Sequence, residues 1–273
     1  MFRAMENVAV VTGAGRGLGK LIALGLADKG FTVCITDIDG DAAQSAADQI
    51  GGQRAWAMPQ DVRDPDSHRR IAAAAAERGT LAVWVNNAGV LRSAHAWDHT
   101  DDEVRLQVEV NTLGLMFGSR AAIEVMQKQG SGHIINIASI SSLVPAPGLA
   151  VYAASKHAVL GFSIALQGDL QHAGLPIKVS SMCPDAIDTD MTRNVKHDRD
   201  AALLFSSARL LTADSVARSV VGLIDHPRLV TVRPRVRGVL AHIVRPFPGT
   251  GLRVLQQFRK LGERNQRRQT KPA

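Results

Sequence analysis

The sequence predicts one α/β domain built around a parallel β-sheet. Short apolar runs rich in β-branched residues alternate with segments of helical periodicity along most of the 273 residues. Nearly continuous apolar runs of this length are typical of strands buried on both faces. The composition, 45% apolar and 21% charged residues, is that of a globular protein. We find no signal-peptide pattern and no apolar run long enough to span a membrane, so we expect a cytoplasmic protein.

Seven segments predict strands: Val8–Thr12, Thr32–Thr36, Arg54–Pro59, Leu81–Asn86, His133–Ala138, Lys178–Met182 and Leu229–Arg233. Helical periodicity predicts helices near 17–30, 40–50, 65–78, 101–129, 151–173 and 212–225. Thr100 and Glu103 form a capping-box pattern before the fourth helix. Repeated strand–helix–strand units with right-handed crossovers give a three-layer, doubly wound parallel sheet of the Rossmann type.

The turn after the first strand is rich in glycine and reads TGAGRGLGK. Its glycines follow the spacing G-x-x-x-G-x-G at Gly13, Gly17 and Gly19, whereas the stricter G-x-G-x-x-G pattern fails because residue 18 is Leu18. Glycines allow unusual backbone angles and let a pyrophosphate approach the main chain. The helix that begins here offers free N–H groups to the same phosphates. The turn therefore predicts a dinucleotide site.

Asp37 ends the second strand and bears on which dinucleotide binds. A carboxylate at this place can accept hydrogen bonds from an adenosine ribose and repels a 2′-phosphate. Arg16 in the glycine turn would instead favour the phosphate. A carboxylate facing a dianion is a direct clash, and Ile38 brings no compensating charge. We therefore expect NAD, with NADP as the weaker ligand.

Motifs farther along the chain resemble those of the short-chain dehydrogenase/reductase family over roughly the first 235 residues. They are TGAGRGLG (Thr12–Gly19), Asp61-Val62, NNAG (Asn86–Gly89), Asn111 in VNTLG, Ser139 in IASIS, YAASK (Tyr152–Lys156) and PDAIDT (Pro184–Thr189). Ser139 precedes Tyr152 by 13 residues, which is the family's spacing. Asp185 departs from the pattern, because the family usually has glycine after this proline.

The resemblance implies a catalytic tetrad of Asn111, Ser139, Tyr152 and Lys156. It also implies a set of cofactor-binding residues, namely Gly13, Arg16, Gly17, Leu18, Gly19, Asp37, Asp61, Val62, Asn87, Ala88, Gly89, Tyr152, Lys156, Pro184, Ile187 and Thr189. In this set Asp61 and Val62 would contact the adenine, and Ile187 and Thr189 would meet the nicotinamide carboxamide. No spacing of histidines or cysteines suggests a metal ion, and we expect none.

Tyr152 is the only tyrosine of the chain and stands four residues before Lys156, so the two share a helix face. A phenol ionises near pH ~10, and a lysine about 4 Å away would lower its pKa by about three units. We expect Tyr152 to move the proton of a substrate hydroxyl while the cofactor takes or gives hydride. Ser139 would hydrogen-bond the substrate oxygen, and Asn111 would hold a water that links Lys156 to solvent.

Three segments are expected to surround the substrate: residues 91–99, 143–149 and 190–211. The last of these would form a mobile lid. Their apolar content favours a lipophilic secondary alcohol or ketone, such as a steroid, a retinoid or another lipid. Two alternatives stay open. One is an NADP-linked ketone or 3-oxoacyl reductase, and the other is a nucleotide-sensing interaction protein that uses a basic tail.

The basic residues gather at the end of the chain. Residues 228–273 hold 12 lysines and arginines and one acidic residue, Glu263, within a chain of net charge +7. We therefore divide the chain into a dehydrogenase domain, 1–235, and a basic helical extension, 236–273. In the extension Leu252, Leu255, Phe258 and Leu261 recur every third residue. Such a helix can lie on a membrane, pack on its own chain or join subunits. No base-reading motif suggests specific nucleic-acid binding.

The resemblance also implies a homodimer or homotetramer. In this family the long helices that carry the tetrad's asparagine and tyrosine usually pack against their copies in a second subunit. Small residues at Ala153, Ala154, Ala158 and Gly161 would permit that close approach.

Overall fold

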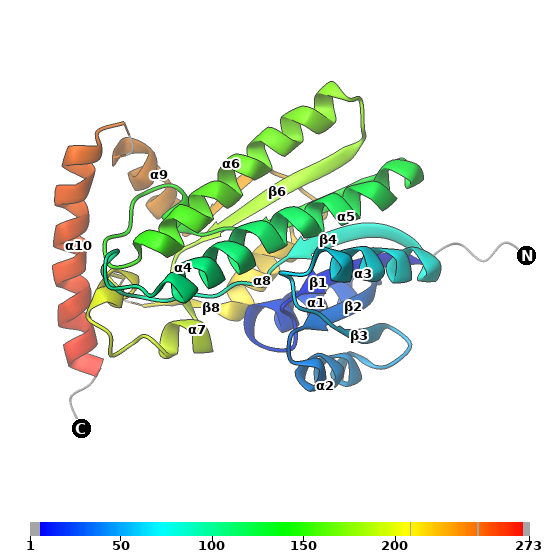
Figure 1. Cartoon of the computed structure of the whole chain (residues 1–273), viewed down its shortest axis with the longest axis horizontal. Helices are drawn as coiled ribbons and strands as arrows, with labels where there is room; N and C mark the ends of the chain where they lie inside the picture. Colours follow the sequence, from blue (N-terminus) through cyan, green and yellow to red (C-terminus); the bar gives the residue numbers. More distant parts are fainter. Residues whose placement is uncertain (1–5, 208, 245, 270–273) are drawn as a thin grey trace, which may run out of the picture.

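The structure, a computed structural model, describes residues 6–207, 209–244 and 246–269. Its centre is a seven-stranded parallel sheet in the order β3-β2-β1-β4-β5-β6-β9 (Figure 1). The strands are β1 (Asn7–Thr12), β2 (Thr32–Asp37), β3 (Ala55–Pro59), β4 (Thr80–Asn86), β5 (Gly132–Ile137), β6 (Ile177–Pro184) and β9 (Val230–Arg233). The predicted Rossmann-type fold is confirmed. The strand order reverses between β1 and β4, and this is where such sheets bind ligands, beyond the carboxyl ends of the strands.

Helices cover both faces of the sheet and bury an apolar core on each. On one face the core is packed by α1 (Gly17–Asp28), α2 (Gly40–Ile50) and α8 (Ala213–Val221). On the other face lie α3 (Pro65–Arg78), α5 (Gly114–Gln129) and α6 (Ala150–His172). The sheet is therefore enclosed, which explains why its strands read as continuous apolar runs.

The helix expected over 101–129 is interrupted. It consists of α4 (Asp101–Val108), a π-helical turn η1 (Glu109–Leu113) and α5. The Thr100–Glu103 capping box forms as expected at the start of α4. Asn111 lies within η1 and is fully buried. Because π turns are rare and occur often at functional sites, the interruption draws attention to this residue.

The chain after β6 forms short elements over the carboxyl ends of the strands. These are β7 (Ile187–Asp188), α7 (Asp190–Arg193), η3 (Asp200–Phe205) and β8 (Leu211–Thr212). β7 pairs with β8 in parallel, so the two ends of residues 190–211, the segment expected to be the lid, are held together. On the other side a short 3-10 turn, η2 (Ile140–Ser142), follows β5.

Two helices complete the chain, α9 (Arg235–Val244) and α10 (Pro248–Gln269). They lie at the end of the molecule opposite the amino terminus (Figure 1). The side chains of Asn265 and Gln266 donate to the carbonyl oxygens of Phe205 and Asp198, each at 2.9 Å. α10 therefore packs on the lid of its own chain, which is one of the three outcomes considered for the extension. The boundary at residue 235 stays a prediction.

The apolar stripe expected on α10 is only partly buried, since Leu255 and Phe258 are half-buried. Leu252 and Leu261 are each 42% exposed. Gly251, Gly262 and Gln266 are buried instead. A Cβ atom at Gly262 would lie 1.8 Å from the carbonyl oxygen of a lid residue, so close backbone approach decides which face is buried.

Candidate active site

The glycine turn places the backbone where a side chain would not fit. Gly13 adopts φ +60°, and a Cβ atom there would lie 2.7 Å from the Cα atom of Ala88. A Cβ atom at Gly19 would lie 2.4 Å from the carbonyl oxygen of Gly13. Helix α1 begins within this turn, at Gly17, and the turn lines a cleft of the molecule. Both geometric demands of a phosphate-binding turn are therefore met.

Asp37 stands beside the glycine turn at the end of β2. Its two carboxylate oxygens accept hydrogen bonds from the backbone N–H groups of Gly15, at 3.0 Å, and Asp39, at 3.1 Å. The side chain is buried but lines the cleft. Arg16 lines the same region and is exposed. The negative charge of Asp37 is thus fixed in the wall of the cleft, whereas the positive charge of Arg16 lies on a side chain that faces solvent.

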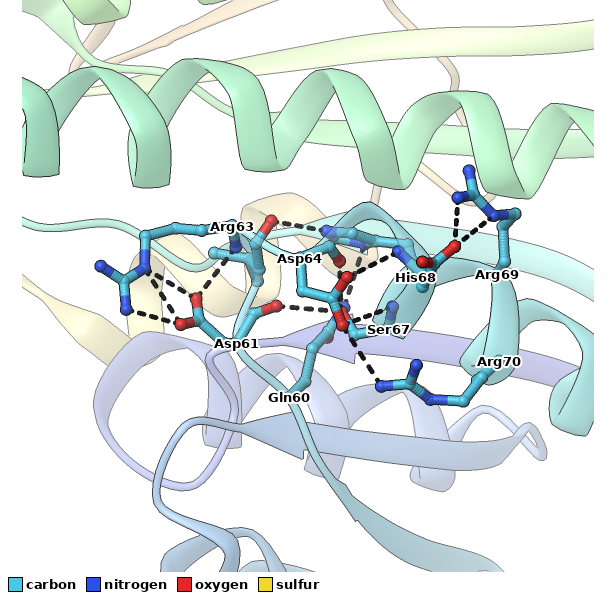
Figure 2. A network of polar contacts seen from close by, with 10 residues as sticks. Gln60, Asp61, Arg63, Asp64, Ser67, His68, Arg69 and Arg70 are labelled. Atoms are coloured by element: carbon cyan, nitrogen blue, oxygen red, sulfur yellow. Dashed lines mark hydrogen bonds and ion pairs between the residues drawn. The ribbon is translucent and has the colours of Figure 1, made fainter.

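The loop after β3 forms the neighbouring wall (Figure 2). Arg63 contacts Asp61 at 2.6 Å, and this hydrogen bond holds the pKa of Asp61 below its usual value. Gln60 Nε2 lies 3.0 Å from Nδ1 of the buried His68, whose Nε2 lies 2.9 Å from the carbonyl oxygen of Val62. These contacts fix Asp61 and Val62, which are expected to meet the adenine. Arg63 also lines the cleft, and no motif had indicated it.

The residues after β4 join the glycine turn directly. Asn87 Nδ2 donates to the carbonyl oxygens of Thr12, at 2.9 Å, and Gly13, at 2.8 Å. The backbone N–H of Ala88 donates to Thr12 Oγ1 at 3.1 Å. Asn87, Ala88 and Gly89 all line the cleft, as expected from the family motif. The carboxyl ends of β1 and β4 are therefore locked in one arrangement.

Tyr152 and Lys156 share a face of α6 and are 8% and 4% exposed. The Tyr152 side chain is hydrogen-bonded to Ser139, the residue that joins β5 to η2. Lys156 Nζ donates to the carbonyl oxygen of Ile137 at 2.9 Å and lies 5.9 Å from the centre of the Tyr152 ring. Three of the four expected catalytic side chains therefore meet in the wall of the cleft.

Burial sets the acidity of these two groups. It raises the pKa of Tyr152 to about 12, although the hydrogen bond with Ser139 opposes this shift. It lowers the pKa of Lys156 to about 8, and the nearby Cys183 opposes that shift. Our expectation that the surrounding side chains lower the pKa of the phenol is therefore wrong, because desolvation of the phenolate is the largest cause of the shift. At neutral pH Tyr152 holds its proton.

Asn111 occupies a buried place beside the cleft rather than in its wall. Its Nδ2 donates to the carbonyl oxygen of Val90 at 2.9 Å and to Ser155 Oγ at 3.1 Å. Its Oδ1 accepts from the Val90 N–H at 2.8 Å. The amide therefore joins η1 to the loop after β4 and to α6. One lone pair of Oδ1 remains for the water that we expect Asn111 to hold.

The cleft has a volume of about 390 Å³ and collects nearly all of the expected residues. Every expected cofactor-binding residue lines it, from Gly13 to Thr189. Its apolar part contains Val90 and Leu106, which no motif or expected segment had indicated. It also contains Val110 and Ile140 from the quoted motifs and Leu91, Met191 and Leu204 from the expected substrate segments. Leu106 and Val110 are four apart on α4 and η1, and that helical spacing just before Asn111 is the signal that could have found them.

The expected substrate segments contribute unequally to this cleft. Residues 190–192 and Leu204 come from the lid, and Leu91 comes from segment 91–99. Segment 143–149 does not line the cleft, so that expectation is wrong. Its apolar side chains Leu143, Ala146 and Leu149 are buried in the core instead. An apolar loop sequence does not distinguish a pocket wall from a core contact.

Comparison with known proteins agrees with this geometry. The family model described as short chain dehydrogenase matches residues 7–200. The chain belongs to this family. An uncharacterized oxidoreductase of Staphylococcus aureus strain N315 is 32% identical over 235 residues, which are 84% of this chain and 97% of that protein. The 1-deoxy-11-beta-hydroxypentalenate dehydrogenase of Streptomyces avermitilis is 34% identical over 220 residues, or 78% of this chain and 79% of that enzyme.

A solved structure is similar over the whole fold. It is a short-chain dehydrogenase/reductase from Burkholderia phymatum in complex with NAD, with a TM-score of 0.80 and 26% identity. The match covers 89% of this chain and 94% of that one. This short-chain dehydrogenase is therefore an oxidoreductase that uses a nicotinamide cofactor and acts on CH–OH groups. Of the helices within the described residues, none has the length and apolar character needed to cross a membrane.

Proposed function

We propose that this short-chain dehydrogenase transfers hydride between NAD and a lipophilic secondary alcohol or ketone, such as a steroid, a retinoid or another lipid. The observation that carries the proposal is that Ser139 and Tyr152 line the same cleft as apolar side chains such as Leu106 and Val110. Polar groups gathered at one point of an apolar pocket orient a ligand whose remaining surface is apolar. The hydroxypentalenate relative is a dehydrogenase of one such hydroxy compound.

Three of the four tetrad side chains take a direct part in the proposed reaction. When bound, the nicotinamide supplies the hydride acceptor or donor. Ser139 holds the substrate oxygen beside the Tyr152 hydroxyl. Tyr152, protonated at neutral pH, donates its proton to a ketone oxygen, and in the reverse direction it accepts the proton of the alcohol. Lys156, with a pKa of about 8, is charged at neutral pH and stabilises the phenolate that remains.

The preference for NAD over NADP rests on Asp37. Its carboxylate is fixed in the cleft wall by two backbone N–H groups, so it cannot easily turn away from an approaching 2′-phosphate. Arg16 and Arg63 also line the cleft and keep an NADP-linked reductase as the alternative. We expect tighter binding of NAD than of NADP to the unchanged protein. Asp37→Asn, which removes the charge and keeps the shape, should narrow that difference, and equal affinities before mutation would contradict the preference.

A substrate screen tests the proposal as a whole. Lipophilic secondary alcohols and short polar alcohols are compared, with NAD and NADP in parallel, by absorbance of the reduced nicotinamide. Turnover of the lipophilic set with NAD is the expected result. Turnover confined to polar alcohols would contradict the substrate class, and turnover confined to NADP would favour the reductase alternative. A cytoplasmic location is part of the proposal and is supported by two buried free thiols, Cys34 and Cys183.

A further inference from the structure

Helix α9 turns one of its two arginines inward and three of its aliphatic side chains outward. Arg237 is turned toward the protein, where its Nε lies 3.3 Å from a carboxylate oxygen of Asp185. Val236, Val239 and Ile243 are 71%, 61% and 64% exposed. Their spacing of three and four residues places them on one face of the helix. An ordinary surface helix does the reverse and buries its aliphatic residues.

The exposed apolar series continues along the chain beyond α9. Phe247 is 66% exposed and Leu252, at the start of α10, is 42% exposed. We call Val236, Val239, Ile243, Phe247 and Leu252 the apolar outer face. Among the described residues 13 large apolar side chains are exposed, and six of these lie between positions 236 and 261. Single exposed apolar residues are ordinary, but a concentration of them marks an interaction site.

Positive charge accompanies this surface. Arg235 in α9 and Arg253, Lys260 and Arg264 in α10 are exposed. The one acidic residue of positions 228–273, Glu263, lies 3.7 Å from Arg259 within α10. Within positions 228–273 the apolar outer face is therefore accompanied by several exposed basic residues and one acidic residue.

We propose that the apolar outer face docks on the surface of a bilayer that contains anionic lipid. The aliphatic and aromatic side chains enter the boundary between headgroups and acyl chains, and the arginines and lysines contact lipid phosphates. Neither helix is able to cross the bilayer, so the chain lies on the membrane surface. A second copy of the chain fits this surface poorly, because a symmetric contact would bring the same basic groups together.

The proposed contact belongs to a helix that touches the cleft wall. α9 and α10 are at the end of the molecule opposite the amino terminus (Figure 1), and Arg237 of α9 pairs with Asp185, which lines the cleft. A substrate dissolved in the bilayer would then have a short path to the active site. Docking itself is independent of the proposed substrate, so it is testable without any activity measurement.

Co-flotation with lipid vesicles tests the docking. The full chain is mixed with phosphatidylcholine vesicles that contain roughly 30% phosphatidylglycerol, and separately with pure phosphatidylcholine vesicles. We expect binding to the anionic vesicles, about tenfold weaker binding to the neutral ones, and release at high salt. No binding to the anionic vesicles, or equal binding to both kinds, would overturn the proposal.

Variants assign the binding to this surface. Replacing Val236, Val239 and Ile243 together with serine should weaken binding about tenfold or more, because three apolar side chains no longer leave water. Arg253→Gln combined with Lys260→Gln should weaken it and reduce its salt dependence. Lys128→Gln, at an exposed lysine of α5, is the matched control and should change nothing. Circular dichroism confirms that each variant is folded.

Three further outcomes would also overturn the proposal. Unchanged vesicle binding by the serine variant would place the contact elsewhere on the molecule. If the unchanged protein does not bind vesicles, and the serine variant has a lower mass than the unchanged protein by light scattering, the apolar outer face is an interface between copies of the chain. Capture by an acidic protein with no affinity for vesicles would assign the surface to a protein partner instead.

Discussion

Tyr152 and Lys156 are both buried, and burial moves their pKa values in opposite directions. The phenol is held protonated, with a pKa of about 12, and the pKa of the ammonium falls to about 8. Both shifts favour the neutral form of each group, as desolvation requires. An acid–base role for Tyr152 therefore depends on positive charge that arrives with an oxidised nicotinamide, in addition to the charge of Lys156.

Replacing the hydroxyl of Tyr152 tests its role. Tyr152→Phe should keep the fold and NAD binding but lose turnover by about 10²–10⁴-fold or more, since the proton transfer has no other group in place. Steady-state kinetics and a nucleotide titration measure the two effects. Lys156→Ala should weaken NAD binding as well, because the family resemblance places the lysine both in the tetrad and among the cofactor-binding residues. A Tyr152→Phe enzyme of near-normal rate would contradict the mechanism.

The ionisation of Tyr152 can be observed directly. It is the only tyrosine of the chain, so the change in ultraviolet absorbance with pH reports on this phenol alone, and Tyr152→Phe gives the blank. We expect ionisation near pH 12 in the free protein and well below ~10 in the NAD complex. A phenol that ionises at ~10 or above with NAD bound would show that the site does not create the base that alcohol oxidation needs.

Two buried histidines make the free energy of unfolding depend on pH. Burial lowers the pKa of His133 to about 4, and it also lowers the pKa of His68. The unfolded chain binds these protons near pH ~6.5, so the folded state loses stability as pH falls from there towards 4. For His133 the loss amounts to about 3 kcal/mol at most. Urea unfolding at several pH values measures it, and His133→Gln should reduce the slope. An unchanged slope would contradict the assignment.

At the scale of elements, the sequence predicts those features that a residue pattern requires and misses those that depend on contacts with distant backbone. Strands such as β1 and β5 were predictable because burial on both faces demands continuous apolar runs. The glycine turn was predictable because only glycine fits so close to Ala88. The π turn η1 was not, since one extra residue in a helical turn leaves the apolar periodicity almost unchanged. The packing face of α10 was not predictable either, because Gly262 and Gln266 contact the backbone of the lid rather than apolar side chains.

Asp185 shows how a departure from the family pattern is accommodated by a distant element. Its carboxylate accepts a hydrogen bond from Ser207 of the lid at 3.1 Å and pairs with Arg237 of α9, with the two side chains 13% and 19% exposed. Arg237 also donates to Ser207 Oγ at 2.7 Å and stacks over the ring of Phe258, 4.8 Å from its centre. The lid, the end of β6 and both helices of the extension therefore meet at this pair.

Breaking this pair should loosen the lid and the extension together. Asp185→Gly, which restores the family's residue, and Arg237→Met should each lower the free energy of unfolding by about 1–3 kcal/mol, because each leaves a mostly buried charge without its partner. The double variant should lose less than the sum. Arg218→Met breaks an exposed pair with Asp214 as the matched control and should cost about 1 kcal/mol or less. Additive losses in the urea unfolding of the three variants would show that the two residues are not coupled.

At the scale of the whole molecule, one side of α6 builds the active site and the other is free to meet a neighbour. Tyr152 and Lys156 point inward, while Ala154, Ala158 and Gly161 are exposed. Ala153 was expected on this outer face, but it is 5% exposed and packs in the core beside Tyr152, so that expectation is wrong. A Cβ atom at Gly161 would meet no atom within 4 Å. We propose that α6 packs against its copy in a homodimer or homotetramer.

A bulky charge on the exposed side of α6 tests this assembly. Small residues let two helices approach closely, so an arginine at Ala158 would separate them and carry like charges into a symmetric contact. Light scattering at micromolar concentration should show a dimer or tetramer for the unchanged chain and a smaller species for Ala158→Arg. Ala76→Arg, at an exposed alanine of α3, adds the same charge elsewhere and should leave the mass unchanged. A monomeric unchanged chain would contradict the assembly. If Ala158→Arg keeps the mass of the unchanged chain, the subunits meet through another surface. If it keeps that mass and also loses turnover, α6 affects only the shape of the active site.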